Sequence, residues 1–365
     1  MFIETKQKLK DFHHKHEKLL EILFFIGGFT FDAIMVSEID DLFGLAQQAV
    51  YLLIIATLLH HEILFRLHKW RPTEGLSDRL WSYRNLLLHF LLGTLLNIYS
   101  LFYIKSASLI NSIIFLILMT ALVIGNELPL VKKAKVSFKI GLFSICLFSY
   151  FSILYPLILG FVGWVPFGLA AATLLGFFYL QIRFLKKRLP DDKTLFQAIL
   201  LPGVSVLVIF TLFYFLGWIP PVPLSVKEQG VYHNVEKKDG KYFLSTEKEW
   251  WKFWQNSDQE FMARPEDKIY FYAQIYSPAR FSDRIFIQWL FKDPVRGWQK
   301  TDHIPLQILG GRKEGFRGFA TKTNYQPGQW RIQVETSMGH EISRMNFEII
   351  SDASQEPRAF TVIEK

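Results

Sequence analysis

The 365-residue chain contains a single cysteine, Cys146, and only 20% of its residues are charged. One cysteine inside an apolar run excludes a disulfide framework and a cysteine-based metal cluster. Half of the residues are hydrophobic and 35 are phenylalanine, which does not fit one soluble globule. A glycine-rich phosphate loop, a serine elbow and the HExxH order of zinc proteases are also missing, so we expect no cofactor and no metal, and a non-enzymatic role is favoured over an enzymatic one.

Long apolar runs fill the chain up to Trp218, and a mixed polar sequence follows. A helix needs about 20 apolar residues to cross a bilayer, because every backbone polar group inside must be paired. Seven segments reach this length: residues 19–37, 42–65, 86–104, 107–131, 138–158, 164–181 and 195–218. Pro156, Gly160, Gly163 and Pro166 separate the fifth from the sixth. The sequence therefore predicts a membrane all-α bundle of seven transmembrane helices over residues 19–218.

Lys and Arg residues alternate between the two sides of this bundle. The segment before the first span and every second connection carry 19 of them, whereas the other connections carry only Lys105. The positive-inside rule then puts residues 1–18 in the cytoplasm and the C-terminal part outside. The same rule explains the net charge of +8, so we expect no nucleic-acid partner.

A Pro-rich linker, residues 219–224, precedes a second domain over residues 225–365. Short alternating runs separated by Gly and Pro predict strands at residues 231–235, 241–244, 269–275, 284–291, 303–308, 316–321, 330–335 and 343–350. In the fourth run Ile285, Ile287, Trp289 and Phe291 share one face. Thr246 and Glu249 have capping-box spacing, which predicts one short helix. We expect an all-β antiparallel, sandwich-like soluble domain.

The C-terminal residues carry a family resemblance. An apolar strand at 306–309, the turn Gly310–Gly311, the pair Phe316–Arg317, and the run 327–331 (PGQWR) with Val334, Gly339 and Phe347 resemble the bacterial family called domain of unknown function 2914. Gly28, Phe29, Phe31 and Asp32 with Ile39 and Asp40 are similar to the first span of its multi-helix members. Gly318, Phe319 and Ala320 depart from the expected polar strand. The resemblance implies a multi-pass protein of a Gram-negative inner membrane with a periplasmic domain, and no established activity.

Five residues are candidates for a binding site: Asp32, Glu127, Arg317, Arg331 and Trp298. A carboxylate at mid-bilayer such as Asp32 costs about 2.5–3.5 kcal/mol, which points to function, although hydrogen bonding to a neighbouring helix is an equal alternative. Glu127 has the alternative of an interfacial carboxylate near lysines. Arg317 and Arg331 have the alternative of a purely solvated position, and exposed tryptophans recognise sugar rings and proteins alike.

His60, His61 and Glu62 are read as solvated interfacial residues rather than a metal site.

Two functions remain open at this stage. The first is a non-enzymatic envelope or sensor protein, whose periplasmic domain binds a protein, a glycan or a lipid headgroup. The alternative is a transporter or intramembrane enzyme that uses Asp32 with other buried polar groups such as Glu127 or His89. Either way, we expect the lipid bilayer to be a partner.

Overall fold

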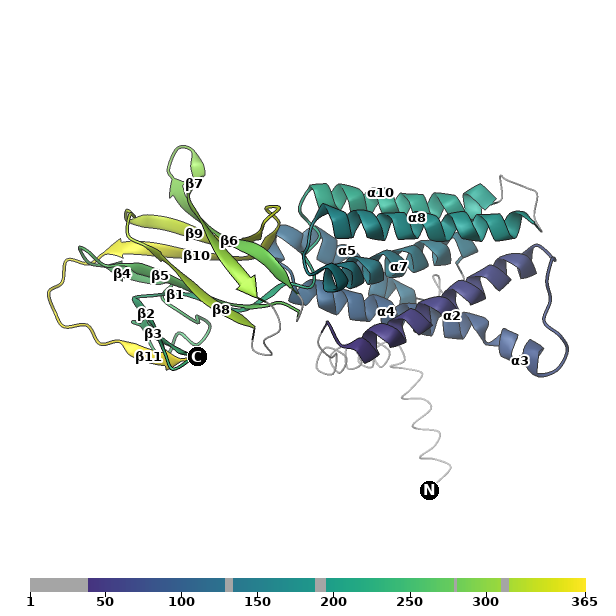
Figure 1. Ribbon diagram of the computed structural model, residues 1–365, viewed down its shortest axis with the longest axis horizontal. Helices are drawn as coiled ribbons and strands as arrows, with labels where there is room; N and C mark the ends of the chain where they lie inside the picture. The colour runs from purple at the N-terminus through teal and green to yellow at the C-terminus, as the bar shows by residue number, and fades with distance from the viewer. Residues whose placement is uncertain (1–38, 129–133, 188–194, 279–280, 310–314) are drawn as a thin grey trace, which may run out of the picture.

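The computed structural model describes residues 39–128, 134–187, 195–278, 281–309 and 315–365. Figure 1 shows a helical bundle and a β region lying end to end along the long axis of the molecule. The predicted first span, residues 19–37, lies outside the described residues, and so does Asp32.

The bundle is formed by α2 (Leu42–Arg66), α3 (Leu76–Ser82), α4 (Arg84–Lys105), α5 (Leu109–Glu127), α7 (Val136–Leu159), α8 (Trp164–Lys186), the π-helical turn η1 (Phe196–Leu200) and α10 (Leu201–Phe215). Six helices are long and apolar enough to cross a bilayer, if η1 and α10 are counted as one. They coincide with the last six predicted spans. The seven-residue helix α3 was not predicted.

Local chemistry fixes the helix ends. The Asp41 carboxylate caps α2 by accepting hydrogen bonds from the backbone N–H groups of Phe43 (3.3 Å) and Gly44 (2.9 Å). α7 ends where Gly160 adopts a φ of 79°, a left-handed conformation that glycine takes without a Cβ clash. The predicted break between the fifth and sixth spans is therefore confirmed, although Pro156 lies inside the last turn of α7.

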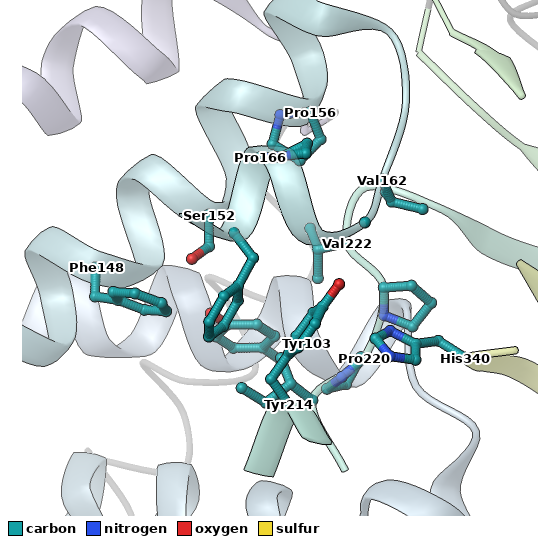
Figure 2. Close-up of a pocket in the computed structure, with 14 residues that line it drawn as sticks. Tyr103, Phe148, Ser152, Pro156, Val162, Pro166, Tyr214, Pro220, Val222 and His340 are labelled. Carbon is teal, nitrogen blue, oxygen red and sulfur yellow. The ribbon is translucent and has the colours of Figure 1, made fainter. Parts of the chain in front are cut away.

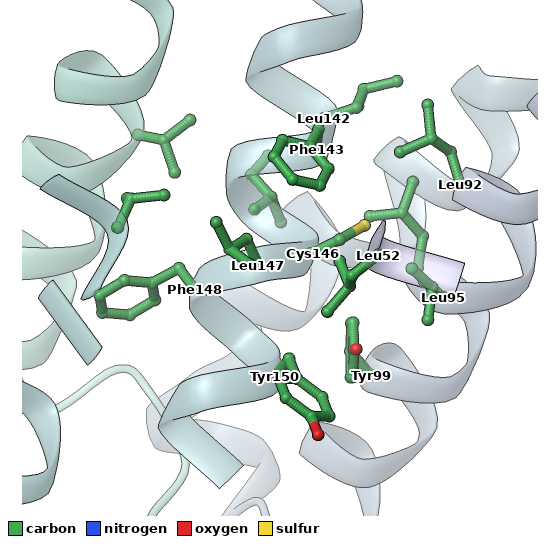
Figure 3. Close-up of a cluster of buried hydrophobic side chains, with 14 of the residues drawn as sticks. Leu52, Leu92, Leu95, Tyr99, Leu142, Phe143, Cys146, Leu147, Phe148 and Tyr150 are labelled. Atoms are coloured by element: carbon green, nitrogen blue, oxygen red, sulfur yellow. The ribbon is translucent and has the colours of Figure 1, made fainter. Parts of the chain in front are cut away.

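The centre of the bundle is apolar. Helix α7 packs against α2, α4, α8 and α10, and Cys146 on α7 is fully buried. Figure 3 shows its sulfur among Leu52, Leu95 and Tyr99, which come from α2 and α4. The cysteine therefore serves as a small apolar core residue.

Eleven strands follow: β1 (Ser225–Tyr232), β2 (Asn234–Lys238), β3 (Lys241–Thr246), β4 (Glu260–Ala263), β5 (Ile269–Tyr276), β6 (Ser282–Asp293), β7 (Gly297–Leu309), β8 (Phe316–Lys322), β9 (Gly328–Thr336), β10 (Glu341–Ser351) and β11 (Thr361–Glu364). They form sheets of order β1-β5-β8, β4-β10-β9-β6-β7 and β11-β3-β2. The first two sheets share one apolar core, to which Phe271 and Ala320 contribute from one side and Ile287, Trp289 and Ile332 from the other. The predicted common face is confirmed: Ile285, Ile287 and Trp289 are fully buried in this core, and Phe291 is partly buried against it.

Two predictions for this region were wrong. The five-stranded sheet is mixed, because β4 pairs with β10 in parallel and the other pairings are antiparallel. The helix predicted after Thr246 does not form, since residues 247–259 contain only turns and bends. The Thr246 hydroxyl donates to Asp258 Oδ1 (2.7 Å) and accepts from the Lys248 N–H (3.1 Å), so it does not cap a helix through Glu249.

Tertiary contacts join the bundle to the β region. Tyr276 on β5 donates to Asp40 Oδ1 (2.8 Å), and Ser108, between α4 and α5, donates to the carboxylate of Glu341 on β10. The ring of His340 lies 4.6 Å from that of Tyr214 on α10. Figure 2 shows His340 beside Tyr214 and Pro220 around a small cavity of about 40 Å³. The segment 219–222 lines this cavity, so the predicted linker packs against the bundle.

Candidate functional site

Two of the five predicted site residues meet on the face of the five-stranded sheet. Trp298 lies at the start of β7 and Arg331 on β9, with β6 between them. The guanidinium carbon of Arg331 lies 4.0 Å from the centre of the Trp298 ring, and its Nε donates to Asn346 Oδ1 (2.8 Å). An aromatic face and an amide therefore hold the guanidinium in one orientation, a cation–π arrangement.

These residues line a polar groove of about 490 Å³. Its other polar lining residues are Gln255, Gln259, Glu260, Lys292, Gln329 and Glu348. Lys292 donates to Gln329 Oε1 (2.8 Å), and Glu260 accepts from Lys252 Nζ (2.9 Å). Arg331 has five N–H donors, of which Nε is used, so its four Nη–H donors have no partner among the described residues. The groove thus offers a fixed fork for an anionic group together with amides and carboxylates for hydroxyl groups.

An exposed aromatic segment borders the groove, just before Gln255. The side chains of Trp250 (90% exposed), Trp251 (48%), Phe253 (82%) and Trp254 (59%) all face solvent. The Lys252–Glu260 ion pair ties this segment to the groove wall. Surface aromatics gathered over so few residues are typical of a binding surface, because the core gains nothing from them. The predicted helix would have placed Trp250 and Trp254 on one face; in the turns and bends that form instead, all four rings are exposed.

The other three predicted residues lie elsewhere. Arg317 is on β8, in the three-stranded sheet, and its backbone carbonyl accepts from Tyr242 (3.0 Å). Glu127 is the last residue of α5, and its side chain lies outside the described residues, as does the whole of Asp32. Their roles therefore remain predictions. Their proposed partner His89 is buried, and Asn126 donates to the His89 backbone carbonyl (2.9 Å), with His89 Nδ1 3.1 Å from Asn126 Oδ1.

The interpretation of Glu62 as a solvated residue was wrong. Its side chain is 1% exposed and accepts from Arg66 Nε (2.8 Å) and Arg84 Nε (2.6 Å). Arg66 is one helical turn away and was visible as a partner in the sequence. Arg84 follows 22 residues later on another helix, so only the tertiary structure brings it to Glu62.

A buried polar cluster in the β region was missed altogether. His233 Nε2 lies 3.2 Å from Glu247 Oε2 and 3.9 Å from Asp258 Oδ2, and its ring stacks on Phe261 at 4.0 Å. Burial raises the pKa of Asp258 to about 6 and lowers the pKa of His233 to about 4, the latter helped by the positive charge of Arg358. His233 is thus neutral at pH 7. The residues of this cluster are far apart in the sequence, and their spacing matches no motif that could have predicted it.

The comparison with protein families gives one match. Residues 282–349 match the family "Protein of unknown function (DUF2914)". The match confirms the resemblance over the C-terminal region, from β6 to β10. It covers Trp298 and Arg331, and also Arg317. No curated protein matches the chain.

Several solved structures show weak similarity. A beta-glucosidase from Listeria innocua in complex with glucose is 12% identical, with 25% of this chain and 15% of that chain covered and a TM-score of 0.20. An immunoglobulin-like protein from Pseudomonas aeruginosa is 12% identical, with 35% and 98% covered and a TM-score of 0.21. The alkylpurine DNA glycosylase of Pseudomonas fluorescens is 8% identical, with 86% and 99% covered and a TM-score of 0.23. At these TM-scores the similarities support no argument about fold or function.

Proposed function

We propose that this protein is a multi-pass inner-membrane protein that presents a periplasmic, sandwich-like β domain for binding an anionic glycan. In this proposal seven helices span the membrane, one of them over residues 19–37. The six apolar helices and the two sheets around one core support the architecture. The basic ends of the helices, which include Arg66, Arg84, Arg183 and Lys186, lie at the end of the bundle away from the β region, which supports the orientation by the positive-inside rule.

The stacking of Arg331 on Trp298 is the observation that carries the glycan proposal. A guanidinium fixed between a ring and an amide is pre-organised for a carboxylate or phosphate, so less rotamer entropy is lost on binding. Sugar rings also carry apolar C–H faces and many hydroxyl groups. The exposed rings of Trp250 and Trp254 can stack on the C–H faces. The side chains of Gln255, Gln259 and Asn346 can hydrogen-bond to the hydroxyl groups.

A glycan array probed with the purified full-length protein tests this proposal. Arrays should carry matched oligosaccharides with and without carboxylate groups, and the acidic members should bind more strongly. Replacing Arg331 by Gln removes a charge-assisted hydrogen-bond donor and should weaken binding by about tenfold to a hundredfold. Trp298→Ala should act in the same direction, because it releases the guanidinium.

Arg317→Gln is the matched control, since it removes an arginine from the same domain but from the other sheet. It should leave binding unchanged. Equal loss in Arg317→Gln and Arg331→Gln would mean that net charge rather than the groove binds the glycan. Binding of neutral and acidic sugars with equal strength would reject the anionic class. If the domain binds a purified protein and no glycan on the array, the ligand is a protein and the glycan proposal is rejected.

The transporter or enzyme alternative rests on Asp32 and remains a prediction from the sequence.

A further inference from the structure

A second groove lies at the end of the bundle away from the β region, where α3 packs beside α2 and α4 (Figure 1). Its volume is about 1000 Å³, and its lining is mostly apolar. Leu76 (73% exposed), Leu80 (64%), Leu87 (42%) and Phe90 (64%) contribute bare side chains to it. An apolar surface of this kind, at the end of a membrane bundle, is suited to an acyl chain.

Aromatic contacts hold α3 in place. Trp81 on α3 is buried, and its ring lies 4.9 Å from that of Trp70 and 5.5 Å from that of Phe65. The helix is therefore anchored by one side, while Leu76 and Leu80, one turn apart, stay open on the groove side. The groove is a built feature of the fold, since it depends on the position of this short helix.

Arg84 supplies a positive charge to the groove wall. Its Nε donates to Glu62 (2.6 Å), and its Nη1 donates to the Trp81 carbonyl (3.0 Å). The guanidinium carbon also lies 4.7 Å from the Trp81 ring centre. Three of the five N–H donors of Arg84 therefore have no partner among the described residues. A guanidinium held in this way can donate hydrogen bonds to a phosphate and still keep its contact with Glu62.

Positive charge exceeds negative charge around Glu62. The single Glu62 carboxylate is shared by Arg66 and Arg84, and the nearby Lys139, whose side chain is 1% exposed, donates to the neutral amide oxygen of Asn85 (2.7 Å). Within this cluster of described residues three cations face one anion. Arg66 is half-exposed, but Arg84 and Lys139 are largely buried. Buried charges are costly unless they are paired, so the cluster favours an additional anion.

We propose that this groove binds an anionic phospholipid, with an acyl chain along Leu80, Leu87 and Phe90 and the phosphate at Arg84. Basic pockets between helices on the cytoplasmic side are suited to such headgroups. The inference rests on the membrane-spanning part of the proposed function and is independent of glycan binding. Its experiment therefore fails or succeeds separately from the glycan array.

Native mass spectrometry of the detergent-purified full chain tests the site. Phosphatidylglycerol and phosphatidylcholine with identical acyl chains are added in equal amounts, and the bound lipids are counted. The wild-type protein should retain phosphatidylglycerol about fivefold more, which corresponds to one cation near an anionic headgroup. Arg84→Gln removes this cation while Arg66 stays paired with Glu62, so the preference should fall toward one.

Two further variants keep the test decisive if Arg84→Gln does not fold. Leu80→Glu places a carboxylate on an exposed part of the groove and should also lower phosphatidylglycerol retention. Arg183→Gln is the matched control, because it removes an exposed arginine at the same end of the bundle but outside the groove. It should leave the preference unchanged.

Three results would overturn the proposal. Equal retention of both lipids by the wild-type protein would remove the anionic preference. A loss in Arg183→Gln as large as that in Leu80→Glu would mean that general surface charge is responsible. Displacement of the lipid by millimolar inorganic phosphate alone would show that the acyl chain contributes nothing, and that the site takes a simple anion.

Discussion

Replacing Asp258 by Asn is expected to raise the free energy of unfolding of the β region above that of the wild type at pH 7.5. At low pH this difference between variant and wild type should disappear. The pKa of Asp258 is raised from 3.8 to about 6 in the folded state, mainly because burial disfavours the charged form. At pH 7.5 the carboxylate is ionised in both states, and folding costs about 3 kcal/mol at 1.36 kcal/mol per pKa unit. The neutral amide avoids this cost.

The sign of the pH dependence follows from proton binding. Because the folded state binds the Asp258 proton more tightly, the contribution of this group to stability rises as the pH falls through 6, and reaches about 2 kcal/mol by pH 4. His233 acts in the opposite direction. Its pKa is lowered from 6.5 to about 4, so the unfolded state binds the proton more tightly and about 3 kcal/mol is lost between pH 6.5 and 4. In the wild-type protein the two contributions nearly offset each other.

Urea unfolding of the segment Leu224–Lys365, followed by circular dichroism between pH 4 and 7.5, measures this effect. The stability difference between Asp258→Asn and wild type should shrink by about 2 kcal/mol on acidification. Titrating groups far from Asp258 cancel in this difference. His233→Gln is the mirror control: relative to wild type it should gain about 3 kcal/mol over the same range. A stability difference that is independent of pH in Asp258→Asn would refute the reasoning.

Four further results are expected. A phosphatase reporter fused after Lys193 should be inactive and one fused after Lys227 active, if the positive-inside count of 19 to 1 sets the topology. The segment Leu224–Lys365 should fold alone and resist reducing agents, which circular dichroism would show, because it contains no cysteine. Asp32→Asn should abolish the phenotype of the gene at normal protein level if the charge is functional, and should be nearly silent if Asp32 only packs helices. Trp289→Ala should destabilise the β region by about 3–5 kcal/mol in urea unfolding, since the ring is fully buried, whereas Val295→Ala at a 92% exposed position should change stability by less than about 0.5 kcal/mol.

The membrane-length helices could be predicted well, because the apolar run that marks each of them is continuous in the sequence. Each described span starts and ends within a few residues of its predicted bounds, apart from the end of α8, Lys186, which extends five residues past residue 181. The short helix α3 was missed because seven residues with Ser77, Asp78 and Arg79 among them carry too little apolar periodicity. Its position depends on Trp70 and Phe65, which only the tertiary fold brings to Trp81.

The β region shows where local patterns stop being sufficient. The Thr246 hydroxyl has an Asp258 carboxylate as its partner, so a long-range contact replaced the local cap. The parallel pairing of β4 with β10 joins Glu260 to Glu348, residues that no local signal connects.

The candidate groove was predicted only as separate residues. Trp298 and Arg331 were selected one by one, and their stacking depends on β6 lying between β7 and β9. Strand order is a long-range property, so alternation along each strand predicts which face a residue takes but not its neighbour across the sheet. The same limit applies to Glu62 and Arg84 in the bundle.

Two hydrogen bonds, from Tyr276 to Asp40 and from Ser108 to Glu341, fix the position of the β region relative to the bundle. At about 3.3 Å per residue, Asn346 and Glu348 lie about 17 and 23 Å along β10 from Glu341. A domain on a loose tether would sweep its binding face through every height and direction. Here the two contacts fix the distance between the groove and the end of the bundle. If the proposed ligand is anchored in another layer, the groove can reach it only when that layer lies at the matching height.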